Sequence, residues 1–122
     1  MSKTGKILWQ DLTVEHAEKV KDFYAEVVGW TFSPVSQGAY DDYNIISSSD
    51  HEVVGGICHK RGALLDFPSQ WLNYVIVEDV DACAEKCSTS GGKVIVGPAM
   101  MGKQKYIVIQ DPAGAYLALM EE

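Results

Sequence analysis

The side chains with the clearest capacity for acid–base chemistry in this sequence are Asp11 and His59. An imidazole titrates near neutral pH, so His59, at the end of a predicted strand, could point into the mouth of a site and act as a general acid or base. The alternative is an exposed histidine at a strand end. Asp11 lies inside a predicted strand, where a carboxylate is costly unless it is solvated or paired. It could face a ligand and attract a cation, or be a satisfied interior acceptor. These two residues are the catalytic candidates.

A second group of candidate residues is aromatic and lies on predicted strands. Trp9 and Tyr74 belong to the first strand of each half of the chain, and Tyr116 belongs to the last strand. Aromatic walls bind planar or cationic ligands by stacking and cation–π contact, although the same side chains can simply form sheet core. The predicted ligand-binding residues are therefore Trp9, Asp11, Tyr74 and Tyr116.

The remaining polar and thiol side chains indicate no further site. Cys83 and Cys87 are four residues apart on one face of a predicted helix, which is typical of core packing, and Cys58 has no activating base beside it in the sequence. An odd set of three cysteines favours reduced thiols and a cytoplasmic protein. The acidic pair Asp41-Asp42 is expected to be a solvated loop feature.

Composition limits the possible partners. The chain has 122 residues, of which 47% are hydrophobic and 22% charged, as in one ordinary globular domain over residues 1–122. Seventeen acidic and ten basic residues give a formal charge of -7, which disfavours nucleic acid and anionic membranes as partners and favours a neutral or cationic small molecule. No run of about 18 apolar residues predicts a membrane span, and the polar start predicts no signal peptide.

The elements that must position these residues occur twice. At an offset of 63 residues, Val14 aligns with Val77, Gly29 with Gly92 and Tyr43 with Tyr106, without a gap. Each half reads as strand, helix and three strands. The repeat therefore predicts two modules, over about 5–60 and 70–122, joined by a linker at 60–70. Periodicity leaves open which face of the sheet Tyr43 and Tyr106 occupy.

Hydrophobic spacing and turn residues give the bounds of these elements. The predicted strands are 7–14, 30–32, 43–47, 52–59, 71–77, 93–96, 105–110 and 115–120, and the predicted helices are 16–28 and 79–90. Ser33-Pro34 and Gly97-Pro98 are expected to end the second strand of each half. In the first helix, one apolar stripe is expected to face the core; it comprises Ala17, Val20, Phe23, Tyr24 and Val27.

Three local motifs resemble those of the vicinal oxygen chelate superfamily, which includes glyoxalase I, extradiol dioxygenases, methylmalonyl-CoA epimerase and the fosfomycin and bleomycin resistance proteins. They are the segment 18–30, which is similar to "EKAxxFYxxxxGW", the helix start at 78–82, and the "DPxG" turn at 111–114. The resemblance covers nearly the whole chain. It implies an α+β fold in which two tandem βαβββ modules form an open, cup-shaped, eight-stranded sheet with the helices outside. It also implies a ligand in the cup and a homodimer.

The resemblance further implies where a metal would be held. The metalloenzymes of the superfamily use a His on the first strand of each module and a Glu on the last strand, and these positions hold Trp9, Leu72 and Ala118 here, with Gly55 as the repeat mate of Ala118. None of these side chains can bind a metal. If the register were wrong by one residue, the neutral amides of Gln10 and Asn73 would stand there instead, and they are poor substitutes.

These positions lead to two functional hypotheses. The first is a small-molecule-binding protein of the glyoxalase/bleomycin-resistance type without the family metal site and without a cofactor. The alternative is a glyoxalase-like lyase or isomerase that acts metal-free or through a relocated metal site.

Overall fold

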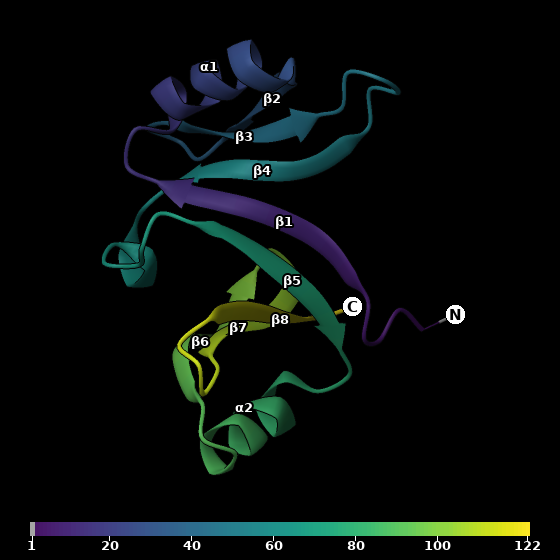
Figure 1. The fold of residues 1–122 in the computed structure, drawn as a ribbon, viewed down its shortest axis with the longest axis vertical. Helices are drawn as coiled ribbons and strands as arrows, with labels where there is room; N and C mark the ends of the chain where they lie inside the picture. The colour runs from purple at the N-terminus through teal and green to yellow at the C-terminus, as the bar shows by residue number, and fades with distance from the viewer. Residues whose placement is uncertain (1) are drawn as a thin grey trace. The chain divides into compact units, whose positions relative to one another are not determined.

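A computed structural model describes residues 2–122 and contains eight strands and two helices in the predicted order, βαβββ followed by βαβββ (Figure 1). The predicted α+β class is confirmed. The first module consists of β1 (Ile7–Val14), α1 (Ala17–Val28), β2 (Thr31–Ser36), β3 (Asp41–Ile46) and β4 (Val53–His59). A short 3-10 turn, Gly62–Leu64, follows. The second module consists of β5 (Trp71–Val77), α2 (Val80–Thr89), β6 (Lys93–Met101), β7 (Gln104–Gln110) and β8 (Tyr116–Glu121).

The strand order is the same in both modules. It is β2-β3-β4-β1 in the first and β5-β8-β7-β6 in the second, so β2 and β6 are open edges of the sheet. The first and last strands of each module pair in parallel, and the remaining neighbours are antiparallel. The chain divides into two compact units. The first-module unit is Gln10–Trp71, and the second-module unit combines residues 2–9 with Leu72–Glu122.

Each unit has its own apolar core between its helix and its strands. In the first-module unit the core consists of Leu12, Val14, Ala17, Ile45 and Ile57. In the second-module unit it consists of Val80, Ile107 and Leu119. Successive side chains of a strand point to opposite faces, so Leu12 and Val14 face α1 whereas Asp11 and Thr13 face away from it. No helix in the described part of the chain has the length and apolar character needed to cross a membrane.

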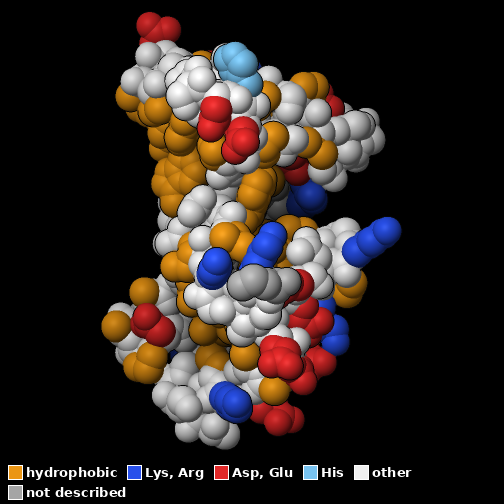
Figure 2. Space-filling model, turned by 90° about the vertical axis from the view of Figure 1, so that its right-hand side faces the viewer, with side chains coloured by type: hydrophobic (Ala, Val, Ile, Leu, Met, Phe, Trp, Pro, Cys, Tyr) orange, Lys and Arg blue, Asp and Glu red, His pale blue; other side chains and the backbone are white. Residues whose placement is uncertain are grey.

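The predicted apolar stripe of α1 is wrong for two of its residues. Ala17, Val20 and Tyr24 belong to or pack against the core, but Phe23 and Val27 are 57% and 64% exposed. The apolar arc of the helix is wider than the surface that the strands of its module cover. Figure 2 shows hydrophobic side chains at the surface in the upper part of the molecule, where Figure 1 draws α1 and β2 to β4.

The sequence predicts that a proline ends the second strand of each module, and this prediction is wrong. Pro34 lies inside β2 opposite Tyr43, and Pro98, which follows a cis peptide bond, lies inside β6. Both strands are edges of the sheet, where a residue without a backbone N–H costs no ladder hydrogen bond. The pairing of β6 with β7 shifts register on both sides of Val96, so the strand continues through irregular steps.

The repeat is not free of gaps, and the structure locates the shift in the helices. The helix α1 has 12 residues whereas α2 has 10. The left-handed glycines that follow them are Gly29 and Gly91, which are 62 residues apart. The offset is therefore 63 up to the helix start and 62 afterwards. The prediction that Gly29 corresponds to Gly92 is wrong by one residue.

This shift changes which residues correspond in the later strands. Asp11 pairs with Gly56 in the first module, and Tyr74 pairs with Ala118 in the second. The repeat mate of Ala118 is therefore Gly56 rather than Gly55. Tyr43 packs against the α1 core, whereas Tyr106 precedes the core residue Ile107 and so faces away from α2.

Candidate functional site

The residues at the expected metal positions do not fit a divalent ion. Leu72 and Ala118 are buried, apolar and turned away from α2, on the face of β5 and β8 that also carries Tyr74. Within the second-module unit, the Gly5 backbone N–H donates a hydrogen bond to the Ile76 carbonyl oxygen and the Ile76 N–H donates one to the Lys6 carbonyl oxygen, so the segment that leads into Trp9 lies beside β5. Among residues 2–122, no three His, Cys, Asp or Glu side chains are grouped as a metal site requires.

The four predicted ligand-binding residues are divided between the two units. Tyr74 is buried with 3% exposure, and Trp9 and Tyr116 are half-buried; all three belong to the second-module unit. Asp11 is a buried residue of the first-module unit. Their roles toward a ligand stay predictions, and so does the catalytic role of Asp11.

The Asp11 carboxylate acts electrostatically on a neighbouring thiol. Asp11 and Cys58 lie on adjacent parallel strands, on the face turned away from α1. Burial raises the pKa of the Cys58 thiol to about 12, and the nearby carboxylates of Asp11 and Asp42 add to the increase. A neutral thiol is a poor nucleophile, so we do not expect Cys58 to act as one at neutral pH.

We expect Cys58 to resist alkylation in the folded protein. Relative to a thiol with the ordinary pKa of 9.0, a pKa of about 12 makes the reactive thiolate roughly a thousandfold rarer near neutral pH. Iodoacetamide labelling at pH 8, followed by peptide mass spectrometry, measures this rate. Labelling in denaturant is the control. A folded-state rate within tenfold of the denatured rate would contradict the prediction.

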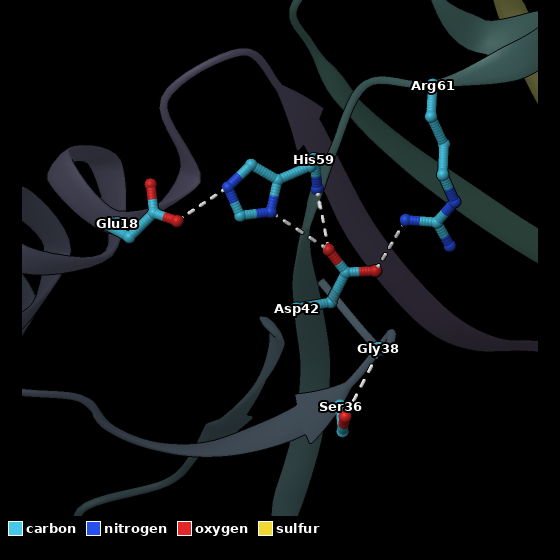
Figure 3. Close-up of polar contacts among 6 residues, drawn as sticks. All are labelled: Glu18, Ser36, Gly38, Asp42, His59 and Arg61. Carbon is cyan, nitrogen blue, oxygen red and sulfur yellow. Dashed lines mark hydrogen bonds and ion pairs between the residues drawn. The ribbon is translucent and has the colours of Figure 1, made fainter. Parts of the chain in front are cut away.

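A connected polar cluster joins α1, β3 and the end of β4 (Figure 3). The Asp42 side chain is at its centre and is 4% exposed, so the expected solvated loop acid is in fact buried. Its Oδ1 accepts a hydrogen bond from the His59 backbone N–H at 2.9 Å and lies 3.2 Å from His59 Nδ1. Its Oδ2 accepts a hydrogen bond from Arg61 Nη1 at 3.0 Å. Arg61 also lies over the Tyr40 ring, at 5.4 Å from its centre.

The His59 side chain is held between two carboxylates. Its Nε2 lies 2.7 Å from Oε2 of Glu18 on α1, and its Nδ1 faces Asp42. The side chain is only 16% exposed, which excludes an exposed strand-end histidine. The ring is directed toward α1 rather than into an open mouth. A carboxylate that orients one nitrogen of an imidazole is a common feature of general bases. Here the second nitrogen is occupied, so proton transfer to a ligand requires the half-exposed Glu18 to move away.

Glu18 makes the stability of this cluster depend on acid pH. A hydrogen bond to its own backbone, followed by the proximity of His59, lowers the pKa of Glu18 below its ordinary 4.5. A carboxyl group whose pKa is lower when folded contributes stability above the unfolded pKa and loses it as the pH falls through the folded pKa.

We therefore expect Glu18→Gln to be less stable than wild type near pH 6 and equally stable near pH 3. Urea unfolding of both proteins across this range measures the difference. Glu26→Gln, a change in an exposed acid on the same helix, controls for loss of surface charge. A difference that persists unchanged at pH 3 would contradict the assignment.

The sequence of the chain is similar to that of one family of known proteins. The model of the Glyoxalase/Bleomycin resistance protein/Dioxygenase superfamily matches residues 6–119. The chain is 31% identical over 122 residues to the Mycobacterium tuberculosis protein named "Putative glyoxylase CFP32", covering 99% of this chain and 46% of that protein. It is 30% identical over 128 residues to the anthracycline biosynthesis protein DnrV of Streptomyces peucetius, covering 94% of this chain and 46% of that protein. The chain therefore spans about half the length of the curated relatives it matches.

Solved structures share the fold at low sequence identity. A superfamily member from Vibrio splendidus 12B01 has a TM-score of 0.62 at 14% identity, over 98% of this chain and 100% of that one. Methylmalonyl-CoA epimerase from Streptomyces coelicolor, in complex with 2-nitronate-propionyl-CoA, has a TM-score of 0.58 at 14% identity, over 99% of both chains. At this identity the similarity concerns the fold alone.

Proposed function

Because this chain belongs to the Glyoxalase/Bleomycin resistance protein/Dioxygenase superfamily, we propose that it is a small-molecule-binding member that works without the metal site of the family's metalloenzymes. The observation that carries the proposal is the chemistry of the metal positions. Trp9, Leu72 and Ala118 stand where the resemblance places two imidazoles and a carboxylate, and the repeat mate Gly56 has no side chain. An indole at position 9 offers a stacking surface where an ion would need a donor.

The charge of the chain and its relatives support a planar, neutral or cationic ligand. The formal charge of -7 disfavours anions, and the buried carboxylate of Asp11 is a potential partner for a cation. Two relatives, each about 30% identical to this chain, are named as anthracycline biosynthesis proteins. We propose that Trp9, Asp11, Tyr74 and Tyr116 each contribute to binding.

A thermal-shift screen with neutral, cationic and anionic planar aromatic compounds tests this function. The proposal expects stabilisation by neutral or cationic compounds. Trp9→Ala should weaken the binding of the most stabilising compound by about 1–3 kcal/mol, the scale of losing a well-packed aromatic contact. Leu65→Ala, which truncates an exposed apolar side chain outside the proposed binding residues, is the control. A screen without a stabilising compound, or a Trp9→Ala protein that binds as tightly as wild type, would contradict the proposal.

A second candidate function is that of a glyoxalase-like lyase or isomerase acting without a metal or through a relocated one. The observation that favours it is the contact between His59 Nδ1 and the buried carboxylate of Asp42, at 3.2 Å. Exchange of solvent deuterium next to a carbonyl group, followed by NMR with 2-oxoaldehydes and acyl thioesters, tests this chemistry. It should be lost in His59→Gln and kept in His51→Gln. Elemental analysis of the purified protein tests the relocated metal.

We also propose a homodimer in which a second copy covers the exposed apolar residues of α1. Phe23, Val27 and Val28 are 57%, 64% and 47% exposed, and the curated relatives contain about as much additional chain as this whole protein. A second copy can take the place of that additional half. Sedimentation equilibrium should give twice the chain mass, and Phe23→Ser with Val27→Ser should shift the protein toward monomer. Lys19→Ser, on the same helix, is the control. A dimer with a Kd of about 10 µM would predominate at about 100 µM protein. A wild-type protein that stays monomeric at this concentration would exclude the dimer.

A further inference from the structure

We propose that the first-module unit contains a separate binding site for a neutral, flat aromatic molecule, on the face of its strands that carries α1. The site is a cavity of about 330 Å³, within the range of small-molecule pockets. It is lined by Gln10, Trp30, Ile45, Val54, Gly55 and Trp71. All six residues belong to one unit. We call this cavity the tryptophan cleft.

The tryptophan cleft exists because two positions differ between the modules. At the corrected offset of 62, Gly55 corresponds to Leu117 and Trp30 corresponds to Gly92. Leu117 packs against the second-module core, so the equivalent space in that module is filled. At Gly55, a Cβ atom would stand 2.6 Å from the carbonyl oxygen of Gln10, which makes a larger residue incompatible with this backbone. The cleft is thus built into the packing of β1 against β4.

The aromatic walls of the cleft are held in place by one another. The ring centres of Trp30 and Trp71 are 5.9 Å apart at an interplanar angle of 70°, and Tyr24 lies 5.6 Å from Trp30 and 5.5 Å from Trp71. Nε1 of Trp71 donates a hydrogen bond to Oη of Tyr24 at 3.3 Å. Trp71 therefore keeps a fixed orientation although it is 39% exposed. A fixed, partly exposed indole can stack on a ligand with little loss of conformational freedom.

The lining residues define the chemical class of the ligand. None of the six is charged, and the overall charge of the protein disfavours an anion. Gln10 provides the one side-chain amide of the lining, which can donate and accept a hydrogen bond. A neutral planar ring system with one hydroxyl or amide group fits these walls. Gln10 and Asp11 point to opposite faces of β1, so this site does not depend on the function proposed above.

Titration with 2-naphthol tests the tryptophan cleft. In a protein with ¹⁵N-labelled tryptophan, the indole N–H signals of Trp30 and Trp71 should shift together and saturate with one Kd, and a shift of the Trp9 signal, which reports the other proposed site, should follow its own Kd. Trp71→Ala should raise the Kd about tenfold, equivalent to losing one aromatic contact. Gln10→Met should weaken the binding of 2-naphthol severalfold but leave the binding of naphthalene unchanged. This variant still tests the site if Trp71→Ala does not fold.

Two comparisons isolate the cleft from other aromatic surfaces. Leu65→Ala, which truncates an exposed apolar side chain outside the lining of the cleft, should bind 2-naphthol as wild type does, and the anion 2-naphthoate should bind at least tenfold more weakly. The proposal is overturned if the Trp30 and Trp71 signals do not respond, or if Trp71→Ala and Gln10→Met both bind as wild type does. It is also overturned if these signals shift with protein concentration alone, because a second copy would then cover the cleft.

Discussion

Replacing Asp42 with alanine is expected to destabilise the protein by about 2–4 kcal/mol, because it removes a buried carboxylate that accepts hydrogen bonds from the end of β4 and from the Arg61 side chain. The His59 backbone N–H would lose its acceptor at 2.9 Å, and Arg61 would lose its partner at 3.0 Å. A domain of this size is stable by about 5–15 kcal/mol, so the loss is a large share of the total. The midpoint of thermal unfolding should fall by roughly 10 °C.

Two further variants identify the cause of that loss. Asp41→Ala removes the neighbouring exposed carboxylate of the same strand and should leave the midpoint within about 2 °C of wild type. Asp42→Asn keeps an oxygen acceptor for the His59 N–H and should restore part of the lost stability. Calorimetry of the four proteins at pH 7 gives the comparison. An Asp42→Ala protein as stable as Asp41→Ala would show that the cluster contributes nothing to stability.

The order of elements could be predicted from the sequence because each depends on local chemistry. Alternation defines β1 and β5 at their observed bounds, and the glycine at 29 has the left-handed backbone expected after a helix. The length of β2 and β6 could not be predicted, because a proline stops a central strand but not an edge strand, and the position of a strand in a sheet is a property of the whole fold. The same limit applies to α1, whose exposed flank depends on how much of the helix the strands cover.

The polar cluster was missed because its members are far apart in the chain. Asp42 precedes His59 by 17 residues and follows Glu18 by 24, and an acid beside another acid resembles a solvated loop. The tryptophan cleft corresponds to a clearer pattern in the sequence. At an offset of 62 rather than 63, Gly55 aligns with Leu117, and a glycine opposite a core leucine indicates missing volume. The shift could not be located without the two left-handed glycines, because the matched tyrosines, Tyr43 and Tyr106, favoured the longer offset.

The apolar character of the metal positions leads to a gain-of-function prediction within the second-module unit. Changing Trp9→His, Leu72→His and Ala118→Glu together would place two imidazoles and a carboxylate on neighbouring strands, on the face turned away from α2. We expect this triple variant to bind Zn²⁺ and wild type to show no saturable binding at the same concentrations. At a Zn²⁺ concentration about a hundred times its Kd, binding should stabilise the variant by about 2.7 kcal/mol. Calorimetric titration and thermal unfolding measure the two effects.

The single variant Trp9→His tests whether removal of the indole is enough for metal binding or whether all three ligands are needed. One imidazole beside Leu72 and Ala118 leaves the ion without the three ligands that a protein zinc site needs, so this variant should not gain metal binding. Its unfolding midpoint should be the same with and without Zn²⁺, whereas that of the triple variant should rise. Circular dichroism of the metal-free triple variant establishes that it folds before zinc is added. Tight binding of one Zn²⁺ by wild type would mean that donors elsewhere in the protein form the site, and the correspondence of Trp9, Leu72 and Ala118 to metal ligands would be wrong.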